Sequence, residues 1–147
     1  MHTPGDRVAA RVRFVIAASL IDGAQGREVH LEMRLENVSS ADVVVNARLA
    51  VAPVIGDVRP EVFAGKRECP FLFRVRLAPL RRESFVRLAP GTSVGGSYLL
   101  SRGYDLGAPG RYRIRATYVS DETWPDLSAS ETYTGELISN EIHIVIP

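Results

Sequence analysis

The chain is short of cysteine and histidine, and each shortage excludes a class of protein or site. Cys69 is the only cysteine, so no intrachain disulfide forms and the disulfide-stapled secreted folds are excluded. The pattern around it favours a buried thiol. His2, His30 and His143 lie far apart, and neither a His-Glu-x-x-His motif nor paired cysteines are present. We therefore predict no metal site and no cofactor.

Long apolar runs are also missing. A membrane span takes about 20 apolar residues, whereas the apolar run at residues 14–21 is much shorter. It follows Arg7, Arg11 and Arg13, which is the order of a signal peptide, but no small-x-small cleavage site comes after it. We expect a strand here, no membrane span and, by default, a cytoplasmic chain. A periplasmic or secreted mature form is the alternative.

Length and composition favour one folded domain over residues 1–147. The 147 residues are 46% hydrophobic and 24% charged, as in ordinary globular proteins. The net charge of +1 conceals an asymmetry. Residues 1–115 contain all 18 Lys and Arg against 11 acidic residues, about +7, whereas residues 116–147 contain six acidic residues and no Lys or Arg, about −6. We expect the acidic segment to pack beside arginine-bearing strands.

Alternation of apolar and polar residues is the dominant pattern. In "VHLEMRLE", Val29, Leu31, Met33 and Leu35 fall on one face, as in a half-buried antiparallel strand. A turn at residues 37–42 and the run "VVVNARLAV" after it predict a hairpin. Further strands are predicted at residues 11–18, 71–80, 85–88, 93–99, 111–119 and 141–146.

This spacing predicts an all-β fold, an immunoglobulin-like antiparallel β-sandwich of seven to nine strands. No window offers a long amphipathic helix. Residues 52–70 and 120–135 break the alternation and are expected to be irregular excursions from the sandwich.

Three runs carry a family resemblance: "NVSSADVVVNARL", "FVRLAPGTSVGGSYLLSRGYDLGAPGRYRIRATY" and "GELISNEIHIVI". Their order resembles immunoglobulin-like sandwich domains of bacterial proteins and is similar to the non-catalytic β-domain of deuterolysin-like metalloproteases. The resemblance implies a scaffold without catalytic residues. It also implies that Tyr112 is a tyrosine-corner residue, whose hydroxyl bonds the backbone near the preceding turn.

An arginine ladder, Arg111, Arg113 and Arg115, alternates with the core face of the predicted strand at residues 111–119. It is a candidate interaction surface. A nucleic-acid site needs interleaved aromatic residues on the same face, and Tyr112 falls on the other face. The pattern therefore favours a solvated strand face, partly neutralised by Glu141, over nucleic-acid binding.

The sequence "GTSVG" at residues 91–95 matches the G-x-S-x-G motif, with Ser93 in the nucleophile position and Asp105 and His143 following. That motif works on a turn between a strand and a helix, and a strand is predicted after Ser93. A serine hydrolase is therefore disfavoured.

Aromatic residues in irregular segments are the other candidate contacts: Trp124 and Tyr133 in the acidic loop, and Phe63 in the excursion at residues 52–70. The alternative for Trp124 is that it folds back onto the core. The acidic residues of the same loop lack the spacing of a calcium loop, which favours solvation and leaves calcium open.

The predicted function is a non-catalytic protein-binding or assembly module of a bacterial protein, with a protein partner. One alternative is an inhibitor of a protease or other enzyme, which would present sandwich loops. The other is a hydrolase that uses Ser93.

Overall fold

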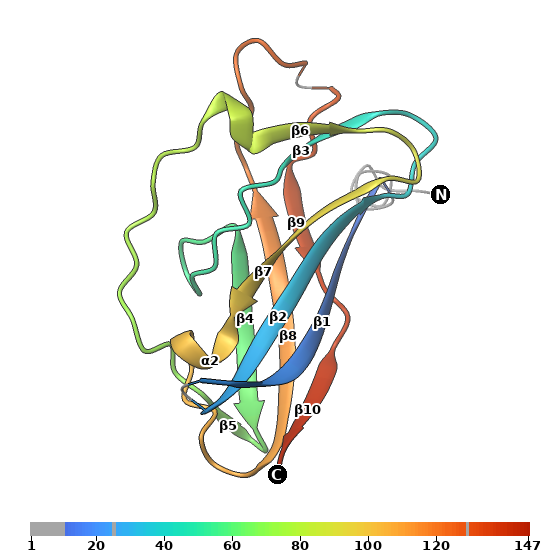
Figure 1. Ribbon diagram of the computed structural model, residues 1–147. Coiled ribbons are helices and arrows are strands. Elements are labelled where there is room, and N and C mark those ends of the chain that lie inside the picture. The colour runs from blue at the N-terminus through green and yellow to red at the C-terminus, as the bar shows by residue number, and fades with distance from the viewer. Residues whose placement is uncertain (1–10, 25, 129) are drawn as a thin grey trace.

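The computed structural model describes residues 11–24, 26–128 and 130–147 (Figure 1). His2 and Arg7 lie outside the described residues. The elements are β1 (Val12–Gly23), β2 (Gly26–Asn37), β3 (Val43–Asn46), β4 (Val58–Ala64), β5 (Arg67–Glu68), the 3-10 turn η1 (Arg82–Ser84), β6 (Phe85–Leu88), β7 (Ser93–Leu99), α2 (Leu100–Gly103), β8 (Gly110–Ser120), β9 (Gly135–Ile138) and β10 (Ile142–Ile146). Within the described ranges no helix is long and apolar enough to span a membrane.

The strands form antiparallel sheets, which confirms the all-β, sandwich-like fold. One sheet has the order β1-β2-β7, and the opposite sheet has the order β10-β8-β4-β5, with β9 also paired to β8. β3 and β6 form a separate two-stranded sheet. The described chain contains ten strands, against the seven to nine expected. The C-terminal strand is divided into β9 and β10, and β5 has only two residues.

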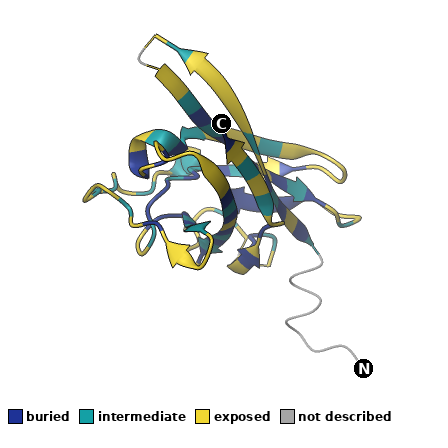
Figure 2. Cartoon of the chain, turned by 90° about the horizontal axis from the view of Figure 1, so that it is seen from below, coloured by how far each residue is buried: buried dark blue, intermediate teal, exposed yellow. Residues whose placement is uncertain are grey.

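The core lies between the two larger sheets. Val29, Leu31, Met33 and Leu35 of β2 are buried, as their alternation predicted. They belong to the same apolar cluster as the inward residues of β8. Figure 2 shows buried and exposed positions alternating along the strands, whereas the far end of the β1–β2 hairpin is largely exposed.

The hairpin predicted between residues 29–36 and 43–51 is wrong. β2 pairs instead with β1 along its whole length, from Val12↔Asn37 to Gly23↔Gly26, and β3 pairs with β6. The Asn37 side chain explains the change of partner, because its Nδ2 donates to the carbonyl oxygens of Ala41 and Leu88 at 2.8 and 2.9 Å. The turn is real, but it directs the chain toward β6.

Two other predicted segments differ from the structure. The excursion at residues 52–70 contains β4 and β5, so only its two ends are irregular. Residues 72–80, predicted as part of a strand, run without a turn or bend but pair with no strand. An alternating sequence favours an extended chain, yet pairing also requires a neighbouring strand. The segment at residues 120–135 is irregular where it is described, as expected.

Tyr112 begins the buried face of β8. Its hydroxyl donates to the Ala108 carbonyl oxygen at 2.7 Å, four residues upstream. This is the bond expected of a tyrosine corner. Further along β8, the hydroxyl of Tyr118 donates to the carbonyl oxygen of Asn46 at 2.8 Å. Burial raises the pKa of Tyr118, so the phenol stays protonated.

Asn140 joins the two sheets at the break between β9 and β10. Its Oδ1 accepts from the Ile16 amide at 2.8 Å, and its Nδ2 donates to the Ile16 carbonyl at 2.9 Å. Ser139 remains bonded to β8. Its amide donates to the Ala116 carbonyl, and its hydroxyl accepts from the Ala116 amide. The side chain of Asn140 therefore supplies the pairing that a strand would give to the free edge of β1.

Replacing Asn140 with Ala is expected to lower the free energy of unfolding by about 1–3 kcal/mol, because both backbone groups of Ile16 lose their partner. Urea unfolding measures this loss. Asn140→Asp keeps the acceptor for the Ile16 amide and loses the donor. Its free energy of unfolding should therefore lie between those of the unmodified protein and Asn140→Ala. An Asn140→Ala midpoint equal to that of the unmodified protein contradicts the assignment.

Candidate protein-binding surface

The arginine ladder faces outward from β8, as predicted, and each member has a partner. Arg113 bonds Glu141 at 3.3 Å, which is the neutralisation expected from the acidic segment. Arg115 pairs instead with Glu61 of β4 at 3.3 Å. Arg111 donates to Nδ1 of His143 at 3.3 Å. These contacts are exposed and individually weak, and carboxylates of the described residues pair with Arg113 and Arg115 but not with Arg111.

Phe63 is covered by the ladder, since the guanidinium of Arg113 lies 4.6 Å from the centre of its ring. This cation–π contact occupies one face of the ring. Phe63 is therefore half-buried, as part of the outer face of the β4–β8 pair.

Tyr133 cannot serve as an interaction residue. Its side chain is 2% exposed and packs 6.3 Å from the ring of Tyr118, and its amide bonds the Val44 carbonyl. That sequence prediction is wrong, because the acidic loop returns to β3 before it reaches β9. Burial also raises the pKa of the Tyr133 phenol.

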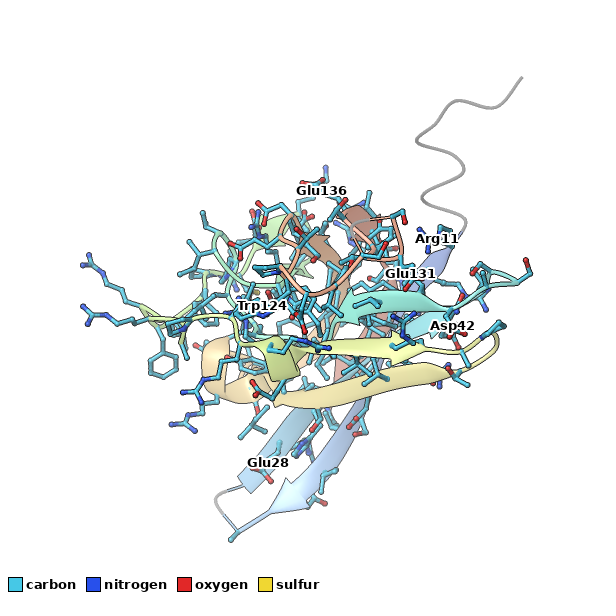
Figure 3. All side chains as sticks on the ribbon, turned by 90° about the horizontal axis from the view of Figure 1, so that it is seen from above. Arg11, Glu28, Asp42, Trp124, Glu131 and Glu136 are labelled. Atoms are coloured by element: carbon cyan, nitrogen blue, oxygen red, sulfur yellow. The ribbon has the colours of Figure 1, made fainter. Side chains whose placement is uncertain are left out.

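Trp124 lies over the body of the protein, where Figure 3 labels it. Its ring is half-buried and lies 5.9 Å from that of Phe85, so the alternative in which it folds back is the one observed. The surrounding acidic residues pair with the chain around β6: Asp126 with Arg82 at 2.9 Å and Glu131 with Arg87. No group of three metal-ligating side chains occurs in the described part of the chain.

Ser93 opens β7 and lies opposite Glu36, so no strand-to-helix turn displays it. His143 contacts Arg111 and Glu141 on the other sheet, and Asp105 accepts from the amide of Gly107. The second glycine of the motif has a structural reason, because a Cβ on Gly95 would lie 2.6 Å from a backbone carbonyl of β2.

Exposed apolar side chains also lie on two irregular segments. Val54 and Ile55 are 77% and 56% exposed, and Leu72 and Phe73 are each 53% exposed. A groove of about 390 Å³ runs between the two segments, lined by Val54, Ile55, Phe73 and neighbouring residues. Residues 54–55 fall in the excursion predicted at residues 52–70, and residues 72–73 fall in the strand predicted at residues 71–80.

Arginines border this apolar patch. Arg74 and Arg76 are exposed, and neither forms an ion pair with a carboxylate of the described residues. In Figure 3, the segment that leads to β6 carries long basic side chains directed away from the body. We call Val54, Ile55, Phe73, Arg74 and Arg76 together the apolar–arginine surface.

The Asp57 carboxylate holds both segments of this surface in place. It is 5% exposed and accepts four hydrogen bonds, from Nε and Nη2 of Arg48 at 2.7 and 2.9 Å, from Nδ2 of Asn46 at 2.9 Å and from the Ala50 amide at 2.9 Å. Nη1 of Arg48 also donates to the Ala78 carbonyl at 2.7 Å. One ion pair thus connects the base of residues 50–57 to residues 71–81.

Local strain accompanies this network. Leu49, between Arg48 and Ala50, is buried with a φ of 52°, a conformation that leucine rarely adopts. The bonds from its two neighbours to Asp57 fix the backbone on both sides. The hydrogen bond to Asp57 also raises the pKa of Arg48, so the guanidinium stays charged.

A search against protein-family models and a search of curated proteins both gave no match for this sequence. The surface is therefore interpreted from its own chemistry.

Asp57→Asn is expected to lower the free energy of unfolding by about 3 kcal/mol, because it leaves a largely buried guanidinium without its counter-charge. Hydrogen exchange should accelerate at Ala50 more than in β2. The control is Asp126→Asn, which breaks an exposed pair with Arg82 and should cost less than about 1 kcal/mol. Equal losses in the two variants contradict the role given to Asp57.

Proposed function

We propose that this protein is a non-catalytic binding module that holds a protein partner on the apolar–arginine surface. The observation that carries the proposal is the joint exposure of Val54, Ile55 and Phe73 around one groove. Contiguous apolar side chains on a folded domain mark interaction sites, whereas single exposed ones are common.

The composition of the surface supports a protein partner. Protein interfaces are enriched in aromatic residues and arginine, and here Phe73 lies next to Arg74. The ring of Phe73 stands edge-on to that of Phe71, with 6.4 Å between the centroids. Phe71 in turn packs against Tyr104, 5.4 Å away. An anchored aromatic side chain loses little further entropy when a partner covers it.

The absence of catalysis is part of the proposal. It is supported by the position of Ser93, which opens a strand and forms no hydrogen-bonded set with Asp105 and His143. A protein-binding surface needs no such set.

We further propose that the domain is related to the immunoglobulin-like sandwiches that its motif order resembles. The strand orders β1-β2-β7 and β10-β8-β4 support this relationship, since they correspond to strands A-B-E and G-F-C of such sandwiches. The Tyr112–Ala108 bond supports it as well.

A double variant tests the proposed function. Ile55→Ser with Phe73→Ser removes two groove-lining apolar side chains that are 56% and 53% exposed, so the fold should persist. We expect a partner captured from a lysate of the source cells to be lost, with affinity for the purified partner falling at least about tenfold, since central apolar contacts contribute about 2 kcal/mol or more.

The matched control is Ile138→Ser with Val145→Ser. These side chains are 68% and 64% exposed, on β9 and β10, which pair with β8 on the side away from β4 and β5. The control should retain the partner. Loss in both double variants, or in neither, contradicts the assignment to this surface. If the captured partner is a protease whose activity falls on binding, the inhibitor alternative is supported.

A further inference from the structure

The backbone of residues 71–78 has the character of an unpaired strand. Residues 72–78 contain no turn or bend and belong to none of the three sheets. Figure 1 shows the connection between β5 and β6 standing apart from the sheets. Pro70 and Pro79, which lack an amide hydrogen, bracket the stretch. It is an extended chain of about 26 Å, at about 3.3 Å per residue.

Two hydrogen bonds fix the direction of its backbone groups. The amide of Leu72 donates to the Gly103 carbonyl at 2.8 Å, and the carbonyl of Ala78 accepts from Arg48 at 2.7 Å. In an extended chain the N–H and C=O of one residue share a side, and those of the next residue take the opposite side. Leu72 and Ala78 are six positions apart and both face the body, which is consistent with one unbroken alternation.

The backbone groups of the odd-numbered residues between Leu72 and Ala78 therefore face outward. Phe73, Val75 and Leu77 present both N–H and C=O on the open side, and within the described ranges these groups have no hydrogen-bond partner. These three alternate residues together form a free strand edge, which is a template for pairing with another chain.

The side chains of this stretch determine which charge a pairing strand should carry. Residues 71–82 contain four arginines and no acidic residue. Arg74 and Arg76 share one face of the stretch, and Phe73, Val75 and Leu77 share the other. Opposed residues of paired strands lie about 5 Å apart and interact directly. A second copy of this stretch, paired antiparallel about Val75, would place Arg74 opposite Arg76, which is repulsive.

We propose that residues 71–78 bind an acidic, extended segment of a partner protein as an added β-strand. This inference rests on the proposed protein-binding function and specifies its mode. Carboxylates of the added strand lie opposite Arg74 and Arg76, and apolar side chains lie opposite Phe73 and Val75. Backbone bonds to the outward groups supply affinity, and the alternating side chains supply specificity.

A model peptide of alternating glutamate and valine, capped at both ends, tests the mode directly. With the peptide at about ten times its Kd, exchange of the Phe73, Val75 and Leu77 amides should slow about tenfold, and the Arg74 and Arg76 amides should change little. A peptide with lysine in place of glutamate should bind far more weakly. Exchange is measured by NMR on the whole 15N-labelled protein.

A pair of variants at one position separates the backbone from the side chain. Val75→Pro removes one outward amide and should weaken peptide binding about tenfold, whereas Val75→Thr keeps both the amide and the branched shape and should stay near the unmodified affinity. Unchanged amide spectra outside residues 70–80 establish that each variant is folded. The peptide titration of the unmodified protein does not depend on either variant.

Each contrary result overturns a separate part of the proposal. Peptide binding without slower exchange at the three amides contradicts strand addition, as does an unchanged affinity in Val75→Pro. Equal binding of the lysine peptide contradicts the selection for acidic partners. Slower exchange that depends on the concentration of the protein alone assigns the edge to a second copy. If no peptide binds while the Ile55/Phe73 variant still loses a captured partner, strand addition falls and the protein-binding function stands.

Discussion

The buried carboxylate of Asp57 is the constraint on which this architecture depends. It gathers donors from the end of β3 and from the turn that leads into β4. Through Arg48 it also reaches Ala78, far along the chain. Because a buried carboxylate is tolerated only when its lone pairs are matched, these segments are held together. The loop at residues 50–57 and the extended stretch at residues 71–78 thereby form one surface.

Charge is distributed in agreement with that arrangement. Three of the six acidic residues of the C-terminal part form ion pairs within the fold, with Arg113 on β8 and with Arg82 and Arg87 around β6. Arg74 and Arg76 have no such partner among the described residues. The chain is therefore nearly neutral as a whole and basic where its apolar side chains are exposed, a combination that suits an acidic partner.

Local pattern predicted the sheets better than it predicted the surface. Alternation identified the buried faces of β2 and β8, and the resemblance to immunoglobulin-like sandwiches implied the hydroxyl bond of Tyr112. The partner of β2 was assigned wrongly, because a turn after residue 36 does not reveal that Asn37 directs the chain to β6. Residues 71–80 have strand alternation, but local sequence cannot show that no strand lies beside them. Trp124 and Tyr133 were predicted as contact residues because they are aromatic residues of the acidic loop. Their burial, however, depends on contacts with residues distant in sequence.

We propose that residues 72–78 are held extended in the free protein, ready for a partner. Backbone 15N relaxation of the unbound protein tests it most directly. Anchored by Gly103 at one end and Arg48 at the other, the amides of residues 73–77 should have order parameters near those of the strands, about 0.85. Values below about 0.6, typical of a flexible loop, would contradict a preformed strand edge.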